Sequence, residues 1–450
     1  MQAPFKAYDI RGRLPDEINE ELAYSVGHAF AAVMRPAGEV AIGRDVRETS
    51  PALAAAVARG LNDAGIDTVD VGLCGTETVY YAAGQPGRGG GIMVTASHNP
   101  IDYNGMKLVR EEARPISADS GLAEIAAAVA AGTRVRANSP GRDRTEDVTD
   151  AYVDQLLRFV DLAKLTPLHL VADAGNGAAG PTFDALAARL PFRVTRIRHE
   201  PDPTFPNGIP NPLLPENQRA TSEAVVAAGA DIGIAWDGDF DRCFVFDAEG
   251  RFVDGYYLVG LLASQLLAEH PGARIVHDPR LYWYTREAVT AAGGTAIRSK
   301  TGHAFIKERM RAEDAVYGGE ISGHHYFRDF FYCDSGMIPW LLVTARMCTS
   351  GASLAELVAE AQAAYPCSGE INRRVADPDA IIAAIDGRYS GDALETDYTD
   401  GLDISFADWR FSLRKSNTEP LLRLNVEARG DRALMQQRTA ELLALIDDGA

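Results

Sequence analysis

Cysteine is scarce in this sequence. The 450 residues include only five cysteines, an odd number, and no two of them form a Cys-x-x-Cys pair. This pattern argues against a disulfide framework and against a zinc site built from paired cysteines. We therefore expect reduced thiols and a cytoplasmic location.

Long hydrophobic runs are also missing. The most apolar stretches, such as Tyr256–Leu267, are too short and too interrupted to span a bilayer. The N-terminal segment MQAPFKAYDIRG has no apolar core of the kind that a secretory signal needs. We expect neither a membrane partner nor a secretory signal.

Basic residues are in deficit. The chain has 44 Lys and Arg against 63 Asp and Glu, which gives a formal net charge of −19. This balance argues against nucleic acid or an anionic membrane as the main partner. An anionic small-molecule substrate stays open, because a local cluster of Arg and Lys outweighs the global charge at short range.

The length predicts three or four domains, at roughly 100–200 residues per domain. One pattern recurs three times: a short apolar strand runs into a turn with an aspartate, and a helix and a second strand follow. The three turns contain Asp45, Asp173 and Asp278. Alternating strands and helices predict three similar α/β domains with largely parallel central strands.

Each repeat continues with an apolar strand that opens a Gly- or Asp-rich loop. The three segments are GIMVTASHNP, DIGIAWDGDFDR and DAVYGGEISGHH. Ligands of such sheets bind beyond the carboxyl ends of the strands, so we expect the chemistry in these loops.

The C-terminal part has a different pattern. A helical segment at 379–387 precedes three apolar strands, and a terminal helix at 433–445 follows, which predicts a small α+β domain. A polar linker at 131–149 and a break near 247–255 separate the earlier parts. The predicted domains are 1–147, 148–251, 252–366 and 367–450.

Ser97 lies in the loop TASHNP, directly after an apolar strand. A serine at the end of a strand accepts a phosphoryl group if a cation and hydrogen-bond donors stabilise its alkoxide. The alternative is a serine that only shapes a turn, and for a lone serine this is the commoner case.

The loop DGDFDR carries three aspartates. Asp237, Asp239 and Asp241 stand two residues apart and can converge on one hard cation. An EF-hand is rejected, because it needs Gly at the sixth position and Glu at the twelfth, where Arg242 and Ala248 stand. Arg242 suits a phosphorylated ligand, since guanidinium groups bind phosphate well. A plain acidic surface turn stays open.

The segment RKSNTEP is typical of a phosphate-binding turn. Arg414 supplies a guanidinium, and Ser416, Asn417 and Thr418 supply further donors. By itself, the segment is equally compatible with a polar turn without function.

A glycine-rich segment offers a different class of function. Gly175–Gly180 reads G-x-G-x-x-G between a strand and a helix, and Glu200 follows about twenty residues later, which formally fits an NAD-dependent dehydrogenase. Pro181 follows at once and the next strand is polar, which favours a tight turn that packs helix on sheet.

Taken together, the motifs TASHNP, DGDFDR, GEISGHH and RKSNTEP resemble the α-D-phosphohexomutase superfamily in order and spacing. FKAYDIRG and KTGHAFIK resemble it as well, so the likeness runs from about Phe5 to Asn425. It implies three related α/β domains and a C-terminal α+β domain around a central cleft. The loop GEISGHH, with Ile321 where Met is commoner, is most similar to the bacterial phosphomannomutase/phosphoglucomutase pattern.

The resemblance also implies a set of site residues. The implied metal ligands are Ser97, through its phosphate, and Asp237, Asp239 and Asp241. The other implied catalytic residues are Arg11, His98, Lys107, Arg242 and His303. The implied substrate-binding residues are Tyr8, Arg280, Glu320, Ser322, His324, Arg414, Ser416, Asn417 and Thr418.

The implied reaction interconverts mannose 6-phosphate and mannose 1-phosphate, and the glucose phosphates as well, through a phosphoserine and a hexose 1,6-bisphosphate. Mg²⁺ is the implied cofactor, and glucose 1,6-bisphosphate or mannose 1,6-bisphosphate is the implied activator. The partners would be hexose phosphates, the product would feed GDP-mannose synthesis, and the chain would be a monomer or a weak dimer. Lys107 and His303 both stay open as the general base. A phosphatase with the same loops and a non-catalytic sugar-phosphate sensor are the alternatives.

Overall fold

The computed structural model describes residues 4–415 and 421–449. The chain divides into two compact units. The first comprises Met1–Phe252 and Gly323–Leu354, and the second comprises Val253–Ser322 and Ala355–Ala450. The chain thus passes from one unit to the other three times, and each unit is described by itself.

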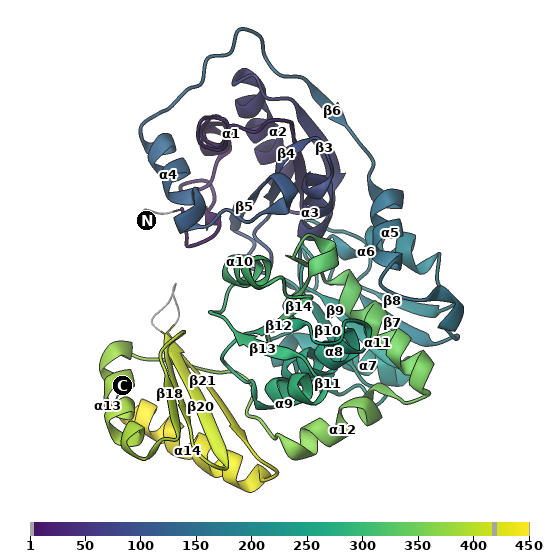
Figure 1. Cartoon of the computed structure of the whole chain (residues 1–450). Helices are drawn as coiled ribbons and strands as arrows, with labels where there is room; N and C mark the ends of the chain where they lie inside the picture. The colour runs from purple at the N-terminus through teal and green to yellow at the C-terminus, as the bar shows by residue number, and fades with distance from the viewer. Residues whose placement is uncertain (1–3, 416–420, 450) are drawn as a thin grey trace. The chain divides into compact units, whose positions relative to one another are not determined.

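The first unit begins with a six-stranded sheet and four helices. Its strands are β1 (Ile10–Arg13), β2 (Glu39–Arg44), β3 (Thr68–Leu73), β4 (Arg88–Val94), β5 (Tyr103–Arg110) and β6 (Asp143–Thr145). Its helices are α1 (Glu20–Met34), α2 (Ser50–Asp63), α3 (Thr76–Gly84) and α4 (Leu122–Ala130). The strand order is β1-β5-β4-β2-β3-β6; β3, β4, β5 and β6 are labelled in Figure 1. Strands β2, β3, β4 and β6 are parallel, and β5 and β1 are antiparallel to their neighbours.

Side chains alternate between the two faces of this sheet, as the pleat of a strand requires. Val40 and Ile42 of β2 pack in the core with helices α1, α2 and α4. Ala41, between them, faces the other way and packs against Ala82 of α3. The sheet is therefore covered by helices on both faces.

A second sheet follows in the same unit. Its strands are β7 (His169–Asp173), β8 (Arg193–Ile197), β9 (Ile232–Trp236) and β10 (Cys243–Phe246), and β11 (Phe252–Val253) reaches the boundary of the unit. The helices of this part are α5 (Thr149–Leu157), α6 (Ala179–Ala187) and α7 (Pro215–Ala228). Strand β7 pairs in parallel with β8 and β9, and β9 pairs antiparallel with β10. Gly323–Leu354 adds β15 (His325–Phe327), β16 (Cys333–Asp334) and α11 (Met337–Ser350).

The second unit contains a parallel set of strands and an antiparallel sheet. The parallel part consists of α8 (Gly255–Glu269), β12 (Arg274–His277), α9 (Trp283–Ala291), β13 (Thr295–Arg298), α10 (His303–Glu313) and β14 (Tyr317–Gly319). The C-terminal part consists of α12 (Leu354–Ala364, beginning at the boundary), β17 (Ile371–Arg374), α13 (Pro378–Tyr389), β18 (Glu395–Asp397), β19 (Leu402–Ser405), β20 (Trp409–Lys415), β21 (Leu421–Ala428) and α14 (Arg432–Asp448). Strand β12 pairs in parallel with β13 and β14.

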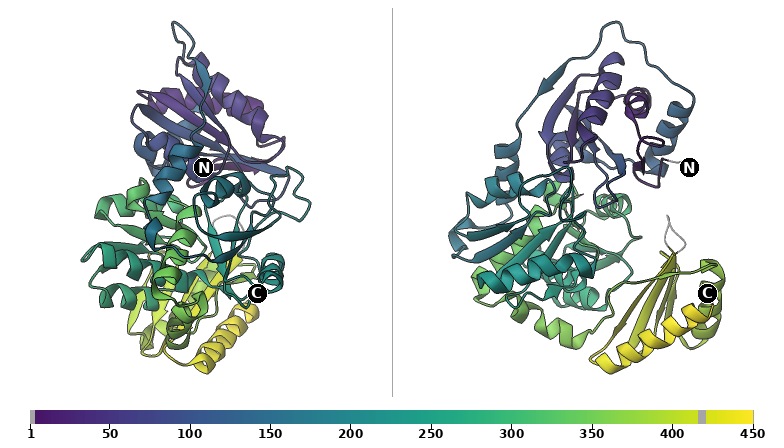
Figure 2. Two further views of the ribbon diagram at one scale, coloured as in Figure 1. Left: turned by 90° about the vertical axis from the view of Figure 1, so that its right-hand side faces the viewer. Right: turned by 180° about the vertical axis from the view of Figure 1, so that it is seen from behind.

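The C-terminal sheet has the order β17-β21-β20-β19-β18, and every pairing in it is antiparallel. Helices α13 and α14 lie against the sheet (Figures 1 and 2). Ile381 and Ile385 of α13 and Leu442 and Ile446 of α14 share one buried core with the strands. This arrangement is the α+β domain that the sequence predicts.

The predicted fold class is confirmed: α/β sheets with parallel central strands precede an α+β C-terminal part. Three details differ. The predicted linker contains β6, because Val69 of β3 pairs with Arg144 there. The sequence predicts a helix that starts at Pro181, but α6 begins two residues earlier, at Ala179, since a proline is tolerated in the first turn of a helix. Strands β17 and β18 were not predicted. The central cleft stays a prediction.

Among the described residues, no individual helix has the length and apolar character needed to cross a membrane; only α11 and α12, counted together as a bent pair, meet these criteria.

Candidate active site

The loop with Ser97 connects the antiparallel strands β4 and β5. Ser97 is buried and has a φ of 49°, a left-handed conformation that is uncommon for a residue other than glycine. Its N–H donates to Thr95 Oγ1 at 2.8 Å. Arg47, also buried, donates from Nη2 to the carbonyl oxygens of Ser97 (3.1 Å) and Asn99 (2.6 Å). The side chains of Thr95 and Arg47 therefore hold the loop backbone in this conformation.

The three aspartates of the second loop come together between β9 and β10. Asp237, Asp239 and Asp241 are fully buried, and one carboxylate oxygen from each lies within 4.8 Å of the other two. The Oδ1 atom of each carboxylate accepts no hydrogen bond from the part of the chain that the structure describes. Buried acceptors without donors are costly, so these three oxygens fit a cation with oxygen ligands.

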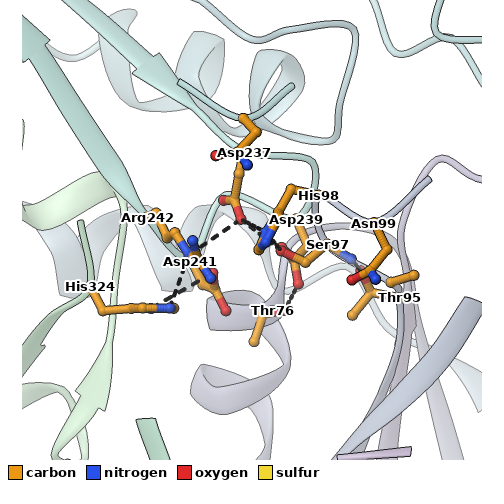
Figure 3. Close-up of polar contacts among 12 residues, drawn as sticks. Thr76, Thr95, Ser97, His98, Asn99, Asp237, Asp239, Asp241, Arg242 and His324 are labelled. Atoms are coloured by element: carbon orange, nitrogen blue, oxygen red, sulfur yellow. Dashed lines mark hydrogen bonds and ion pairs between the residues drawn. The ribbon is translucent and has the colours of Figure 1, made fainter. Parts of the chain in front are cut away.

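The two loops meet although 140 residues separate them in the sequence. Ser97 Oγ donates to Asp237 Oδ2 at 2.7 Å. His98 Nδ1 lies 3.0 Å from Ser97 Oγ and 3.6 Å from Asp237 Oδ2. Figure 3 shows these side chains gathered beside Asp239. A serine hydroxyl, an imidazole and a carboxylate cluster thus lie together in one site.

Lys107 and Thr76 complete the surroundings of Asp239. Lys107 projects from β5, donates from Nζ to Asp239 Oδ2 at 2.8 Å and forms an ion pair with Asp241. Thr76, the first residue of α3, donates from Oγ1 to the same Asp239 oxygen at 2.6 Å. Within this group, three carboxylates face one lysine.

The burial and mutual repulsion of the carboxylates show in their pKa values. Burial and the charge of Asp239 raise the pKa of Asp241 to about 6. Burial and Asp239 also raise the pKa of Asp237. Burial acts in the same direction on Asp239, but the Lys107 ammonium outweighs it and lowers the pKa of Asp239. A bound cation would relieve the repulsion among the three groups.

Arg242 and His324 border the cluster on one side (Figure 3). Arg242 Nε donates to His324 Nε2 at 3.0 Å and lies 3.7 Å from Asp237 Oδ2. His324 Nδ1 lies 3.0 Å from Asp334 Oδ2. The structure therefore places His324 in the first unit, beside the loop with the three aspartates.

Arg11 belongs to the same unit. Its Nη1 donates to Asn99 Oδ1 at 2.6 Å, and its Nη2 lies 2.6 Å from Asp9 Oδ2. Burial opposes the charge of Arg11, but the carboxylates of Asp9 and Asp239 raise its pKa. The guanidinium thus stays cationic next to the Ser97 loop. Tyr8, directly before Asp9 in the sequence, is half-buried.

Three of the predicted substrate-binding residues lie together in the second unit. Arg280 Nη2 donates to Ser322 Oγ at 3.2 Å and lies 3.6 Å from Glu320 Oε1. Glu320 Oε1 also accepts the backbone N–H of Gly302 at 2.9 Å, directly before His303 at the start of α10. A carboxylate, a hydroxyl and a guanidinium here offer both acceptors and donors to a polyhydroxy ligand.

Arg414 lies at the end of β20 in a cluster of arginines around Glu370. Arg414 Nη2 donates to Glu370 Oε2 at 3.1 Å, and Arg280 Nη1 and Arg423 Nη1 reach the same carboxylate at 3.3 and 3.2 Å. Arg414 Nη1 also donates to Thr301 Oγ1 at 3.2 Å. The predicted phosphate ligands Ser416, Asn417 and Thr418 lie outside the described residues.

Sequence reasoning missed several members of these clusters. Thr76 follows β3, so the rule about the carboxyl ends of parallel strands would have found it. Arg423 stands as a lone arginine in the otherwise apolar start of β21, LLRL, and that contrast is a usable signal. Asp334 and Glu370 have no distinctive local pattern.

Comparison with known proteins identifies the family. The chain matches four domains described as phosphoglucomutase/phosphomannomutase: alpha/beta/alpha domain I at residues 2–136, domain II at 150–250, domain III at 254–365, and the C-terminal domain at 370–444.

Individual proteins give the same result. The chain is 58% identical to a phosphomannomutase of Salmonella montevideo, over 98% of both chains. It is 57% identical to a protein of Xanthomonas campestris described as phosphohexose mutases, again over 98% of both. A crystal structure of a phosphoglucomutase/phosphomannomutase family protein from Burkholderia thailandensis is 33% identical, with a TM-score of 0.88 over 100% of this chain and 99% of that one. This chain therefore belongs to the phosphoglucomutase/phosphomannomutase family.

Proposed function

We propose that this chain is a phosphomannomutase that interconverts mannose 6-phosphate and mannose 1-phosphate, and that it also accepts the glucose phosphates. The contact that carries the proposal is the one between Ser97 Oγ and Asp237 Oδ2, at 2.7 Å, because it joins a nucleophile to a cluster of buried carboxylates. The Salmonella and Escherichia coli relatives, described as phosphomannomutases, are 58% and 55% identical and support the same reaction.

The proposed cofactor is Mg²⁺, with Asp237, Asp239 and Asp241 as its protein ligands and a phosphate oxygen on Ser97 as a further one. The three aspartate oxygens without hydrogen-bond donors among the described residues support this assignment. All three ligands are hard oxygen donors, which suits Mg²⁺. When bound, Mg²⁺ would stabilise negative charge on the transferring phosphoryl group and on the serine oxygen.

In the proposed forward step, O1 or O6 of the sugar attacks the phosphorus carried by Ser97. The bond from phosphorus to Ser97 Oγ breaks as the bond to the sugar oxygen forms, and a general base takes the proton of the sugar hydroxyl. The product is a hexose 1,6-bisphosphate. It turns over and returns its other phosphoryl group to Ser97, whose hydroxyl proton then needs an acceptor.

His98 is suited to accept that proton. Burial and the nearby cations Arg242 and Arg11 lower the pKa of His98, so its imidazole is neutral at pH 7. Its Nδ1 lies within hydrogen-bond distance of Ser97 Oγ. Lys107 is suited to a different role: burial opposes its charge, but Asp239 and Asp241 raise its pKa, so it stays an ammonium. We therefore favour Lys107 as a cation that stabilises charge, with His303 as the base for the sugar hydroxyl.

Substrate binding is proposed for the second unit and the start of the first. Glu320 and Ser322 would hold sugar hydroxyls, and Arg414 with Ser416, Asn417 and Thr418 would hold the phosphate that does not react. Tyr8, Arg11, Arg280 and His324 would line the transfer site. The bisphosphate activator, the four domain boundaries of the sequence analysis, a cytoplasmic location and a monomeric or weakly dimeric state belong to the same proposal.

The experiment that tests this proposal measures isomerisation of mannose 1-phosphate and glucose 1-phosphate side by side, with Mg²⁺ and a catalytic amount of glucose 1,6-bisphosphate. We expect both sugars to be converted to the 6-phosphates, and EDTA to stop the reaction. Release of inorganic phosphate without isomerisation would instead identify a phosphatase, and no reaction with either sugar would refute the proposal.

A further inference from the structure

The glycine-rich turn Gly175–Gly180 contains no space for a dinucleotide. A Cβ atom on Gly175 would lie 2.3 Å from Pro210 Cβ, and a Cβ atom on Gly177 would lie 2.8 Å from the carbonyl oxygen of Gly238. In a nucleotide-binding turn, such glycines leave room for a pyrophosphate. Here protein atoms fill that room, so the glycines have another purpose.

Gly177 packs directly on the loop 237–242, which carries the three aspartates and is called the metal loop below. Besides the carbonyl oxygen, its Cβ position lies 3.1 Å from Gly238 Cα and 3.2 Å from Gly238 C. The next residue, Ala178, donates its N–H to the Gly238 carbonyl oxygen at 3.1 Å. The turn before α6 therefore touches the backbone between Asp237 and Asp239, and it does so without an intervening side chain.

Gly238 in turn packs on the Ser97 loop. A Cβ atom on Gly238 would lie 2.6 Å from the Ser97 carbonyl oxygen. Arg47 Nη2 holds the same oxygen at 3.1 Å. Three backbone segments are thus stacked in the order Gly177, Gly238 and Ser97, each in contact with the next.

We propose that Gly177 is a positioning residue for phosphoryl transfer, because its lack of a side chain sets how closely the metal loop approaches Ser97. Contacts below 3.0 Å to backbone atoms are not relieved by a rotamer change, so a side chain at this position displaces the loop. The displacement reaches Asp237 and Asp239 on either side of Gly238. The inference rests on the proposed function, in which these aspartates bind Mg²⁺ and Ser97 carries the phosphoryl group.

The test compares Gly177→Ala with the wild-type chain. We expect the Kd for Mg²⁺, measured by isothermal titration calorimetry, to rise about tenfold and kcat to fall roughly ten- to a hundredfold, since misplacement by about 1 Å costs about a hundredfold in rate. KM for mannose 1-phosphate should change little, because the binding groups for sugar and spectator phosphate lie elsewhere. Elevated Mg²⁺ should restore part of the lost rate.

Gly180→Ala is the matched control. Gly180 belongs to the same turn, and its Cβ atom would lie 2.1 Å from the His199 carbonyl oxygen, with no metal-loop atom among its nearest neighbours. This variant should lower the melting temperature but leave the Kd for Mg²⁺ unchanged. If Gly180→Ala raises the Kd as much as Gly177→Ala does, the effect is general destabilisation, and the positioning role of Gly177 is refuted.

A second variant covers the case in which Gly177→Ala does not fold. Ala178→Pro removes the N–H that donates to Gly238 and adds no atom to Gly177. The φ of Ala178, −83°, is close to the proline range. We expect the same direction of change in Kd, with a smaller size.

The outcomes separate the inference from the function that it rests on. Wild-type values of Kd and kcat in folded Gly177→Ala would overturn the inference and leave the mutase proposal intact. A wild-type chain that binds Mg²⁺ but isomerises no hexose phosphate would overturn the mutase proposal, while the Kd of the variants would still report on Gly177.

Discussion

Each unit contains a group of buried charged side chains. The two groups differ in how many of their carboxylate oxygens accept hydrogen bonds. In the first unit, Asp237, Asp239 and Asp241 each leave an oxygen without a donor among the described residues. In the second unit, both carboxylate oxygens of Glu427 accept hydrogen bonds. Its Oε1 accepts from Arg410 Nη1 at 2.6 Å and from the Tyr282 N–H at 3.0 Å, and its Oε2 accepts from the Tyr256 hydroxyl.

Arg410 itself has several further partners. Arg410 donates to the carbonyl oxygens of Pro279 and Arg280 at 2.9 Å each, forms an ion pair with Asp403, and stacks over Tyr282 with 3.9 Å from Cζ to the ring centroid. The difference teaches that burial alone does not distinguish scaffold from site. A cluster of buried carboxylates, each with an oxygen that lacks a donor among the described residues, does, because repulsion adds to the cost of the missing hydrogen bonds and a bound cation relieves both.

The largest effect should come from Ser97→Ala. We expect turnover to fall roughly 10⁴-fold or more, as when a nucleophile is removed, while unfolding changes by about 1 kcal/mol for the lost hydrogen bond. Ser50→Ala is a matched control, because Ser50 is also buried and donates to an aspartate, Asp45, at 2.6 Å. Steady-state kinetics and urea unfolding of both variants check this. Comparable turnover in the two variants would contradict the role of Ser97.

Arg410→Met should have the largest effect on stability. It leaves Asp403 and Glu427 buried without their common partner, which costs about 3–5 kcal/mol of unfolding free energy. The Kd for Mg²⁺, measured by calorimetry on the folded variant, should stay at the wild-type value. A loss below about 1 kcal/mol in urea unfolding would show that this group is not the scaffold that its many contacts suggest.

Asp241→Asn should have the opposite effects from Arg410→Met: a loss of activity and, without metal, a gain of stability. It removes a proposed Mg²⁺ ligand, so kcat should fall about a hundredfold. Without metal at pH 7, we expect the variant to be more stable than the wild type by about 1 kcal/mol, because a repelled, buried charge is gone.

The stability gain of Asp241→Asn should depend on pH. The folded-state pKa of Asp241 is raised to about 6, above its ordinary value of 3.8, so the wild type loses stability as the pH rises through 6. The gain should therefore shrink when unfolding is measured in EDTA below pH 6. A variant that is less stable than the wild type at pH 7 without metal would show that the cluster is already satisfied.

The smallest effect should come from Arg414→Ala. Loss of one charge-assisted contact to the spectator phosphate costs roughly 1.5–3 kcal/mol, or about ten- to a hundredfold in kcat/KM. Because that phosphate changes little during transfer, the loss should appear mainly in KM, and equally from mannose 1-phosphate and mannose 6-phosphate. Kinetics in both directions check this. A collapse of kcat at constant KM would assign Arg414 to the transferring phosphate.

Much of this site could be predicted from the sequence, because its parts follow local rules. Ser97 and Asp237 stand in loops after apolar strands, and parallel strands end at the same edge of a sheet. The rule that ligands bind at the carboxyl ends of strands does not say which loops meet. The contact between Ser97 and Asp237 joins residues 140 positions apart in the sequence, so it depends on how the two sheets pack.

Other features of the site are either invisible in the local sequence or easily assigned to another role. The motif GEISGHH reads as one loop, yet the chain changes units between Ser322 and Gly323, so Glu320 and His324 belong to different units. Arg47 supports the Ser97 loop through carbonyl oxygens, which any residue type provides. Thr76 was missed because a hydroxyl at a helix start is usually only a cap.

The division of the first unit along the chain has a consequence for its biosynthesis. Trp236 Nε1 donates to the Gly336 carbonyl oxygen at 2.9 Å, and the Cys243 N–H donates to the Gly323 carbonyl oxygen at 3.0 Å. These partners are translated only after the whole of Val253–Ser322, which takes several seconds at about 5–20 residues per second. During that interval, the nascent chain carries Ser97 and the three aspartates but lacks α11, so Phe183 does not yet have Trp340 of α11, against which its ring packs in the folded unit. The timing of translation therefore creates a window in which a chaperone would find this chain.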